Sequence, residues 1–177
     1  MLSGCATQVP DVASVSMSDL SRTGRFALKA EEFGREPEAV QGGFTWIDSG
    51  QRLTLDLTNP FGNVLARVVV DSGIATLTRS NGEILQAATP DELVAMVLGQ
   101  SIPVQGLREW LRLRLPDRAI AAMTGVTRDA QGYVDAFNQN GWRVQRSRFD
   151  ERGPRLLVLS RNDQGKAIHI RLVIDNP

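Results

Sequence analysis

Few residues in this chain are suited to nucleophilic or metal chemistry. Its 177 residues include one cysteine, Cys5, and one histidine, His169. A Ser-His-Asp triad would need His169 as its general base, but this residue lies mid-strand in an alternating pattern, on the polar face beside Arg171. One His and one Cys also exclude the usual zinc ligand sets, so that only carboxylate cation sites remain open.

Sequence motifs of catalysis and cofactor binding are also missing. The chain contains no Gly-x-Ser-x-Gly elbow, no phosphate-binding glycine-rich loop and no His-rich metal motif. Twenty basic and twenty acidic residues give a net charge of zero and a pI near 6.6, so no overall field attracts nucleic acid. We therefore expect a protein that is not an enzyme, has no cofactor and does not bind nucleic acid.

The lone cysteine lies in the motif Leu2-Ser3-Gly4-Cys5. A Leu three residues before a Cys, with small residues between them, is the lipobox of bacterial lipoproteins, in which the thiol receives a diacylglycerol thioether. We expect Cys5 to be a lipid anchor; the alternative is a small buried thiol that happens to follow a glycine. Ala6 stands where Asp would retain an enterobacterial lipoprotein in the inner membrane, which indicates the outer membrane.

The chain divides into an N-terminal segment and one domain. Residues 1–21 are a lipobox remnant and a polar tether, with a short helix expected around Val12–Leu20. The charged and apolar parts of a signal peptide are missing, so we expect a truncated form or a late start codon, not lipidated as it stands. Residues 22–177 have the length of a single domain, which we expect to be monomeric. No run approaches the roughly 18 apolar residues of a membrane-spanning helix.

Alternating apolar and polar residues predict short strands through most of this domain. The pattern begins at Thr23, and turns such as Asn81-Gly82 favour antiparallel pairing of sequential strands. The predicted strands cover Phe26–Ala30, Phe44–Trp46, Leu53–Thr58, Val64–Asp71, Ile74–Arg79, Glu83–Ala87, Tyr133–Phe137, Trp142–Phe149, Arg155–Arg161 and Ala167–Ile174.

Two helices interrupt the strands. Thr89-Pro90-Asp91-Glu92 supplies a capping Thr, a Pro at the first helical position and two acids in the first turn, and Gly99 ends the helix. Its expected apolar face is Leu93, Met96 and Val97. A second helix is predicted from Pro103 to Pro116, with Leu107, Trp110 and Leu111 at helical spacing.

About ten antiparallel strands with one helical pair predict a mainly β (α+β) fold, either a strongly curved sheet or an open barrel. The helices fall where a closing wall would lie. The interior of such a barrel is either filled by side chains or left as a cavity for an apolar ligand, and the composition does not decide between these alternatives.

Three further segments carry a family resemblance: Leu57-Thr58-Asn59-Pro60-Phe61-Gly62, the segment Ile102 to Trp110, and the segment Asn138 to Val144. Together with the lipobox, their order and spacing resemble the LolB family over roughly Gly24 to Ile174. The resemblance implies an unclosed antiparallel β-barrel of about ten or eleven strands, with a helical lid over an apolar cavity.

The resemblance also implies a function. LolB proteins are anchored to the periplasmic face of the outer membrane, accept acylated lipoproteins from a periplasmic carrier, LolA, and insert them into outer-membrane lipid. Without a nucleotide-binding loop, such a transfer must run downhill from a weaker to a tighter binder and then to the bilayer. The alternative from another class is a structural lipoprotein, a subunit of an outer-membrane assembly that needs no lipid cavity.

The expected acyl-chain cavity is formed by inward-facing apolar residues, although any single one of them is better explained as ordinary core than as cavity lining. From the strands these are Phe26, Leu28, Phe44, Trp46, Leu55, Leu57, Val68, Val70, Trp142, Leu157, Leu159, Ile168, Ile170 and Leu172. From the helices they are Leu93, Met96, Val97, Leu107, Trp110 and Leu111. We expect Trp110 to report ligand binding by its fluorescence.

The turn Pro60-Phe61-Gly62 joins two predicted strands. Pro60 and Gly62 favour a tight projecting turn whose tip has few neighbours, so we expect Phe61 to be exposed. In the LolB family an exposed leucine at the matching loop acts in membrane insertion, and here the residue is Phe. The alternative is that Phe61 folds back as a hairpin cap.

Overall fold

The alternating pattern produces eleven strands and three short helices in residues 19–175, the part of the chain that the computed structural model describes. The strands are β1 (Leu20–Glu32), β2 (Glu38–Asp48), β3 (Leu53–Thr58), β4 (Val64–Asp71), β5 (Ile74–Arg79), β6 (Ile84–Ala87), β7 (Thr124–Arg128), β8 (Val134–Gln139), β9 (Trp142–Phe149), β10 (Pro154–Asp163) and β11 (Lys166–Ile174). The helices are α1 (Pro90–Leu98), α2 (Val104–Trp110) and α3 (Asp117–Ala121).

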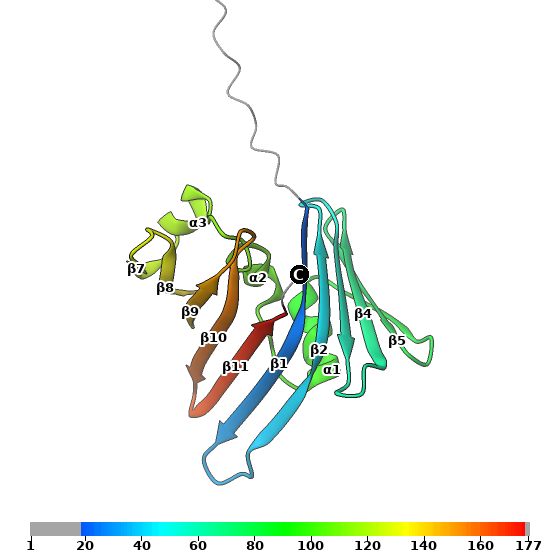
Figure 1. The fold of residues 1–177 in the computed structure, drawn as a ribbon. Helices are drawn as coiled ribbons and strands as arrows, with labels where there is room; N and C mark the ends of the chain where they lie inside the picture. The colour runs from blue at the N-terminus through cyan, green and yellow to red at the C-terminus, as the bar shows by residue number, and fades with distance from the viewer. Residues whose placement is uncertain (1–18, 176–177) are drawn as a thin grey trace, which may run out of the picture.

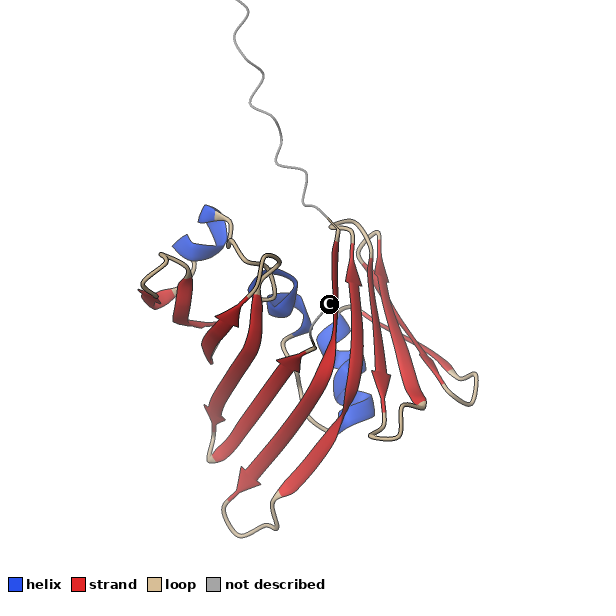
Figure 2. Ribbon diagram, viewed as in Figure 1, coloured by secondary structure: helices blue, strands red, loops and turns tan. Residues whose placement is uncertain are grey.

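All eleven strands form one antiparallel sheet in the order β6-β5-β4-β3-β2-β1-β11-β10-β9-β8-β7. The first and last strands thus pair at the centre, and β6 and β7 are the two free edges. The sheet curves strongly, and α1 and α2 lie on its concave side (Figure 1). Strands dominate the structure and helices are few (Figure 2). The prediction of a mainly β, unclosed antiparallel barrel of ten or eleven strands is confirmed.

Strand β1 shows how the pattern selects the concave face. Its odd and even positions alternate between buried and exposed from Leu20 to Ala30, as a strand with one covered face requires. Phe26 pairs with Leu172 of β11, and both side chains are buried. The strand begins at Leu20, six residues before the predicted start at Phe26, so the expected helix cannot extend to Leu20. The rest of the predicted tether and helix lies outside the described residues.

Helix α1 confirms its predicted bounds. The Thr89 hydroxyl accepts a hydrogen bond from the amide of Glu92 at 3.4 Å, and Gly99 takes a left-handed φ of 72° while its amide donates to the carbonyl of Ala95. A glycine at this position avoids the steric cost of a left-handed backbone. None of the helices in residues 19–175 is long and apolar enough to span a membrane.

The second predicted helix is wrong in extent, because α2 ends at Trp110 and not at Pro116. Beyond it the backbone bonds to other elements: the amide of Leu113 donates to the carbonyl of Arg152 at 2.8 Å, and the buried guanidinium of Arg146 donates to the carbonyls of Arg112 and Leu113. These long-range bonds replace the helical ones. Helix α3 and strand β7 were not predicted, and β7 lacks a buried alternating face.

Candidate functional site

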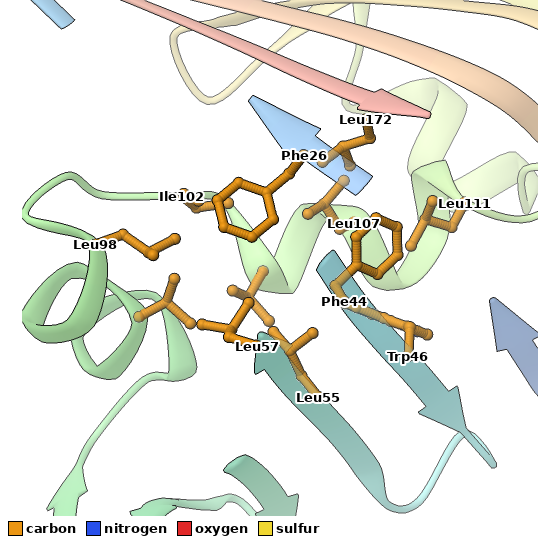
Figure 3. Close-up of a pocket in the computed structure, with 12 residues that line it drawn as sticks. Phe26, Phe44, Trp46, Leu55, Leu57, Leu98, Ile102, Leu107, Leu111 and Leu172 are labelled. Atoms are coloured by element: carbon orange, nitrogen blue, oxygen red, sulfur yellow. The ribbon is translucent and has the colours of Figure 1, made fainter. Parts of the chain in front are cut away.

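An apolar cavity lies between the helices and the concave face of the sheet. Its volume is about 30 Å³, and twelve side chains line it, all of them apolar. Figure 3 shows these side chains converging from three sides, with α1 and the following loop facing strands β1 to β3. The lining residues are Phe26, Phe44, Trp46, Leu55, Leu57, Val94, Leu98, Ile102, Val104, Leu107, Leu111 and Leu172.

Eight of these residues were among the predicted cavity residues. Four were missed: Val94 and Leu98 on α1, Ile102 in the loop after it, and Val104 at the start of α2. All four are apolar residues around the Gly99 stop. For Val94 and Leu98, the signal that could have found them is their spacing with Pro90 and Leu93, which places one apolar stripe on α1.

The face predicted for α1 is wrong at Met96, which is 52% exposed. The helix buries Pro90, Leu93, Val94 and Leu98, so its apolar stripe is rotated away from Met96. Val97 is half-buried against the core. The remaining predicted residues are buried in the core without lining this cavity: Leu28, Val68, Val70, Leu93, Trp142, Leu157, Leu159, Ile168 and Ile170.

Trp110 is fully buried but also lies outside the cavity lining. Its indole Nε1 donates to the side-chain oxygen of Gln139 at 2.8 Å, and its ring meets Phe137 edge-on with centroids 5.7 Å apart. A Cβ atom at Gly106 would lie 2.6 Å from the same ring, so a glycine is needed there. Trp110 therefore holds α2 against β8, which corrects the expectation that it reports on the cavity.

Trp46 takes over that expectation, because it is 1% exposed and lines the cavity. An acyl ligand in this cavity should change the packing and polarity around the Trp46 indole. We expect ligand to shift tryptophan emission in the parent, and Trp46→Phe to lose most of the shift. Trp110→Phe should retain it. A response that follows Trp110 or Trp142 instead would place the ligand elsewhere in the barrel.

One wall of the cavity, α2, is anchored to the sheet by a buried ion pair. Arg108 donates to both carboxylate oxygens of Asp48, at 3.1 and 2.7 Å, and Arg112 lies 3.4 Å from the same carboxylate. The amide of Gly50 also donates to it. Burial raises the pKa of Asp48, but the hydrogen bond from Arg108, the Gly50 amide and the two positive charges outweigh burial, so its pKa lies below 3.8.

A second ion pair joins β1 to the turn between β9 and β10. Arg22 donates two hydrogen bonds to Asp150, at 2.7 and 2.9 Å. Burial raises the pKa of Asp150, but Arg22 and the amides of Arg152 and Gly153 hold it at about 2. This ion pair lies at the end of the barrel where the chain enters β1, and it holds β1 to the β9–β10 turn there.

The opposite wall, α1, is attached in a different way. Leu93 and Val94 bury its inner face, and α1 packs on β4, β5 and β6. Two hydrogen bonds tie its ends to other described residues: Asp91 accepts from the amide of Gln105, and the guanidinium of Arg79 donates to the carbonyl of Met96 at 3.4 Å. The loop after α1 is held by Gln100, which donates to Glu38 at 2.6 Å.

The turn between β3 and β4 projects one aromatic side chain into solvent. Phe61 is 90% exposed, so it does not fold back as a hairpin cap. The side chain of Asn59 accepts from the amides of Phe61 and Asn63, at 2.9 and 3.0 Å, and Gly62 has a left-handed φ of 88°. The turn is fixed by these hydrogen bonds to the Asn59 side chain and needs no packing of the aromatic ring.

The other residues considered for chemistry form no site in the described chain. His169 is exposed on the outer face of β11, in register with Lys29 and Ser160. In residues 19–175 no three His, Cys, Asp or Glu side chains gather as metal ligands. Cys5 lies outside the described residues.

An antiparallel sheet curved into an unclosed barrel, with short helices enclosing an apolar cavity, defines a half-barrel protein whose interior suits apolar ligands. The family model for outer-membrane lipoprotein LolB matches residues 18–176. The chain belongs to the LolB family of outer-membrane lipoproteins.

Two relatives by sequence agree with this assignment. An outer-membrane lipoprotein LolB of Bordetella petrii is 49% identical over 178 residues, covering 100% of this chain and 88% of the relative. One from Cupriavidus metallidurans is 35% identical, covering 98% and 89%. A crystal structure of a LolA superfamily protein from Nitrosomonas europaea aligns with a TM-score of 0.47 and 10% identity, covering 89% and 87% of the two chains.

Proposed function

We propose that this chain is a lipoprotein receptor, anchored through Cys5 to the periplasmic face of the outer membrane. It accepts lipoproteins from the carrier LolA by binding their acyl chains in the barrel, and it delivers them into outer-membrane lipid at the Phe61 turn. The observation that carries this proposal is the wholly apolar lining of the cavity. A structural subunit of a membrane assembly would have no need of such a lining.

The energetics suit a receptor that holds acyl chains. Each methylene kept from water is worth about 0.8 kcal/mol, so one long chain gains roughly 10 kcal/mol by leaving water. An apolar cavity provides this gain in free energy, because no polar group has to lose its water when the chain enters. Transfer then follows the order of affinities, from carrier to receptor to bilayer.

Acceptance requires the cavity to enlarge. A space of about 30 Å³ holds about one water-sized group and no acyl chain. The wall that moves is α1, because α2 is fixed by the Asp48 ion pair and by the Trp110 hydrogen bond. Apolar packing can slide without breaking buried charge pairs, and the ligand replaces the contacts that α1 gives up.

The test is binding of a fluorescent fatty acid to the full chain carrying Cys5→Ala, followed by displacement with a diacylated lipopeptide. We expect binding that is independent of the anchor. Ile102→Trp adds bulk to the cavity lining and should weaken binding by about tenfold. Ile74→Trp, at an exposed position, is the matched control and should bind like the parent.

Circular dichroism of each variant establishes that the fold is kept. If the folded protein binds no acyl probe, or if Ile102→Trp and Ile74→Trp bind equally, the receptor proposal fails. That result would instead favour the alternative, a structural lipoprotein that binds no acyl chain.

A further inference from the structure

Phe33 is a second unexplained aromatic side chain. It lies in the turn between β1 and β2 and is 100% exposed. The turn is closed without it, because the amide of Arg35 donates to the carbonyl of Glu32 at 3.1 Å and Gly34 has a left-handed φ of 79°. Neither the core nor the cavity uses this ring.

Phe33 and Phe61 project from the same end of the sheet. Figure 1 shows the β1–β2 and β3–β4 turns at the end opposite to the one where the chain enters β1. Strand β2 lies between the two hairpin turns and pairs with both β1 and β3. The apolar surface continues beyond the Phe61 turn, since Val64 and Leu65 at the start of β4 are 46% and 37% exposed.

We infer that Phe33 is a second membrane contact, which enters a zwitterionic phospholipid surface together with Phe61; this rests on the proposed function of the Phe61 turn. Two aromatic tips on separate turns form a convex surface. A lipid interface accepts isolated aromatic rings at the level of its headgroups. A protein partner would need a separate pocket for each tip.

The charges beside Phe33 favour neutral lipid. Positions 29 to 38 contain two basic residues, Lys29 and Arg35, and four glutamates, so this end of the hairpin has a net negative charge. Ion pairs join Lys29 to Glu31 at 2.6 Å and Arg35 to Glu32 at 3.2 Å. An anionic surface would therefore gain nothing from these side chains, and the contact is made by the ring.

The second contact determines how the barrel lies on the membrane. Thr58, at the end of β3, pairs with Gly43, whereas β2 begins at Glu38. The two turns are thus offset by five residues along β2, or about 16 Å at about 3.3 Å per residue. A flat surface touches both tips only when it is inclined to β2. A single contact at Phe61 would leave the barrel free to pivot.

The test places an environment-sensitive nitrobenzoxadiazole label at one position at a time. Cys5 is the only cysteine, so Cys5→Ala makes Phe33→Cys, Phe61→Cys or Ile74→Cys the unique thiol. Ile74, which is 57% exposed and begins β5 after the β4–β5 turn at the opposite end, is the control. With vesicles of phosphatidylethanolamine and phosphatidylcholine, we expect a blue shift and nitroxide-lipid quenching at positions 33 and 61, but not at 74.

A partition measurement completes the test in unlabelled protein. Phe33→Glu should lower the partition coefficient onto the same vesicles by about tenfold, and Phe33→Leu should stay near the parent. If the label at position 61 shows the blue shift and quenching but the label at position 33 does not, the inference is wrong and the proposed function stands. If neither label responds to vesicles, both are wrong. Equal responses at all three, or a response at 33 to LolA without vesicles, also overturn the inference.

Discussion

Phe61→Glu is expected to accept lipoprotein from the carrier normally and to release it poorly into membranes. The side chain is 90% exposed, and Asn59 fixes the turn through backbone amides, so folding should change by less than about 0.5 kcal/mol. A carboxylate at the membrane boundary costs about 1–3 kcal/mol. Release should therefore slow by about 10- to 100-fold.

A two-step transfer assay separates these effects. The first step measures transfer of a labelled lipoprotein from LolA to the receptor, and the second measures its appearance in outer-membrane vesicles. Phe61→Leu keeps an apolar tip and is the control, which should behave like the parent in both steps. If Phe61→Glu fails at acceptance but not at release, Phe61 belongs to a carrier-docking surface and its membrane role is wrong.

Asp48→Asn is expected to destabilise the fold by about 3 kcal/mol, because it removes the counter-charge of a buried pair. The Asp48 side chain is 0% exposed, and those of Arg108 and Arg112 are only 19% and 12% exposed. Both guanidinium groups would lose their anion while remaining largely desolvated. Urea unfolding measures the loss.

Asp56→Asn is the matched control, since Asp56 and Arg67 form a similar pair on the exposed face, with bonds of 2.6 and 2.7 Å. Exposed pairs are worth under about 1 kcal/mol. Equal losses in the two variants would show that burial of the Asp48 pair has no special role.

The same pair has a signature in acid. Because the folded pKa of Asp48 lies below 3.8, the ionised carboxylate contributes stability that is fully present above about pH 4. This contribution is lost as the pH falls through the folded pKa. Asp48→Asn should therefore show a shallower loss of stability on acidification than the parent.

Where one face of a strand is covered, the sequence was sufficient to locate the strand, although β1 and β2 extend beyond the predicted Phe26–Ala30 and Phe44–Trp46. Strands Leu53–Thr58 and Trp142–Phe149 occur with the predicted bounds. In a sheet with one face buried and the other in solvent, apolar and polar residues alternate along each strand, and this alternation can be read from the sequence. Residues 111–116 could not be placed in this way. The carbonyls of Arg112 and Leu113 accept hydrogen bonds from Arg146, which lies more than thirty positions further along the chain. A local sequence pattern does not include that partner.

The cavity shows a similar division. Phe44 and Leu159 have the same inward phase on their strands and are both buried, yet only Phe44 lines the cavity. The difference lies in where α1 and α2 rest on the sheet, which is a matter of tertiary packing. The exposure of Phe61, in contrast, followed from its two neighbours, Pro60 and Gly62.

The position at which the chain enters β1 limits what an anchored molecule can reach. From Leu20, the 13 residues of β1 cover about 43 Å before the Phe33 turn. The peptide between Cys5 and Asp19, about 14 residues, can extend to at most about 50 Å. Fully extended, this peptide is thus only slightly longer than β1. A molecule lipidated at Cys5 could therefore bring the Phe33 and Phe61 turns to its own bilayer only with this peptide almost fully extended alongside the barrel.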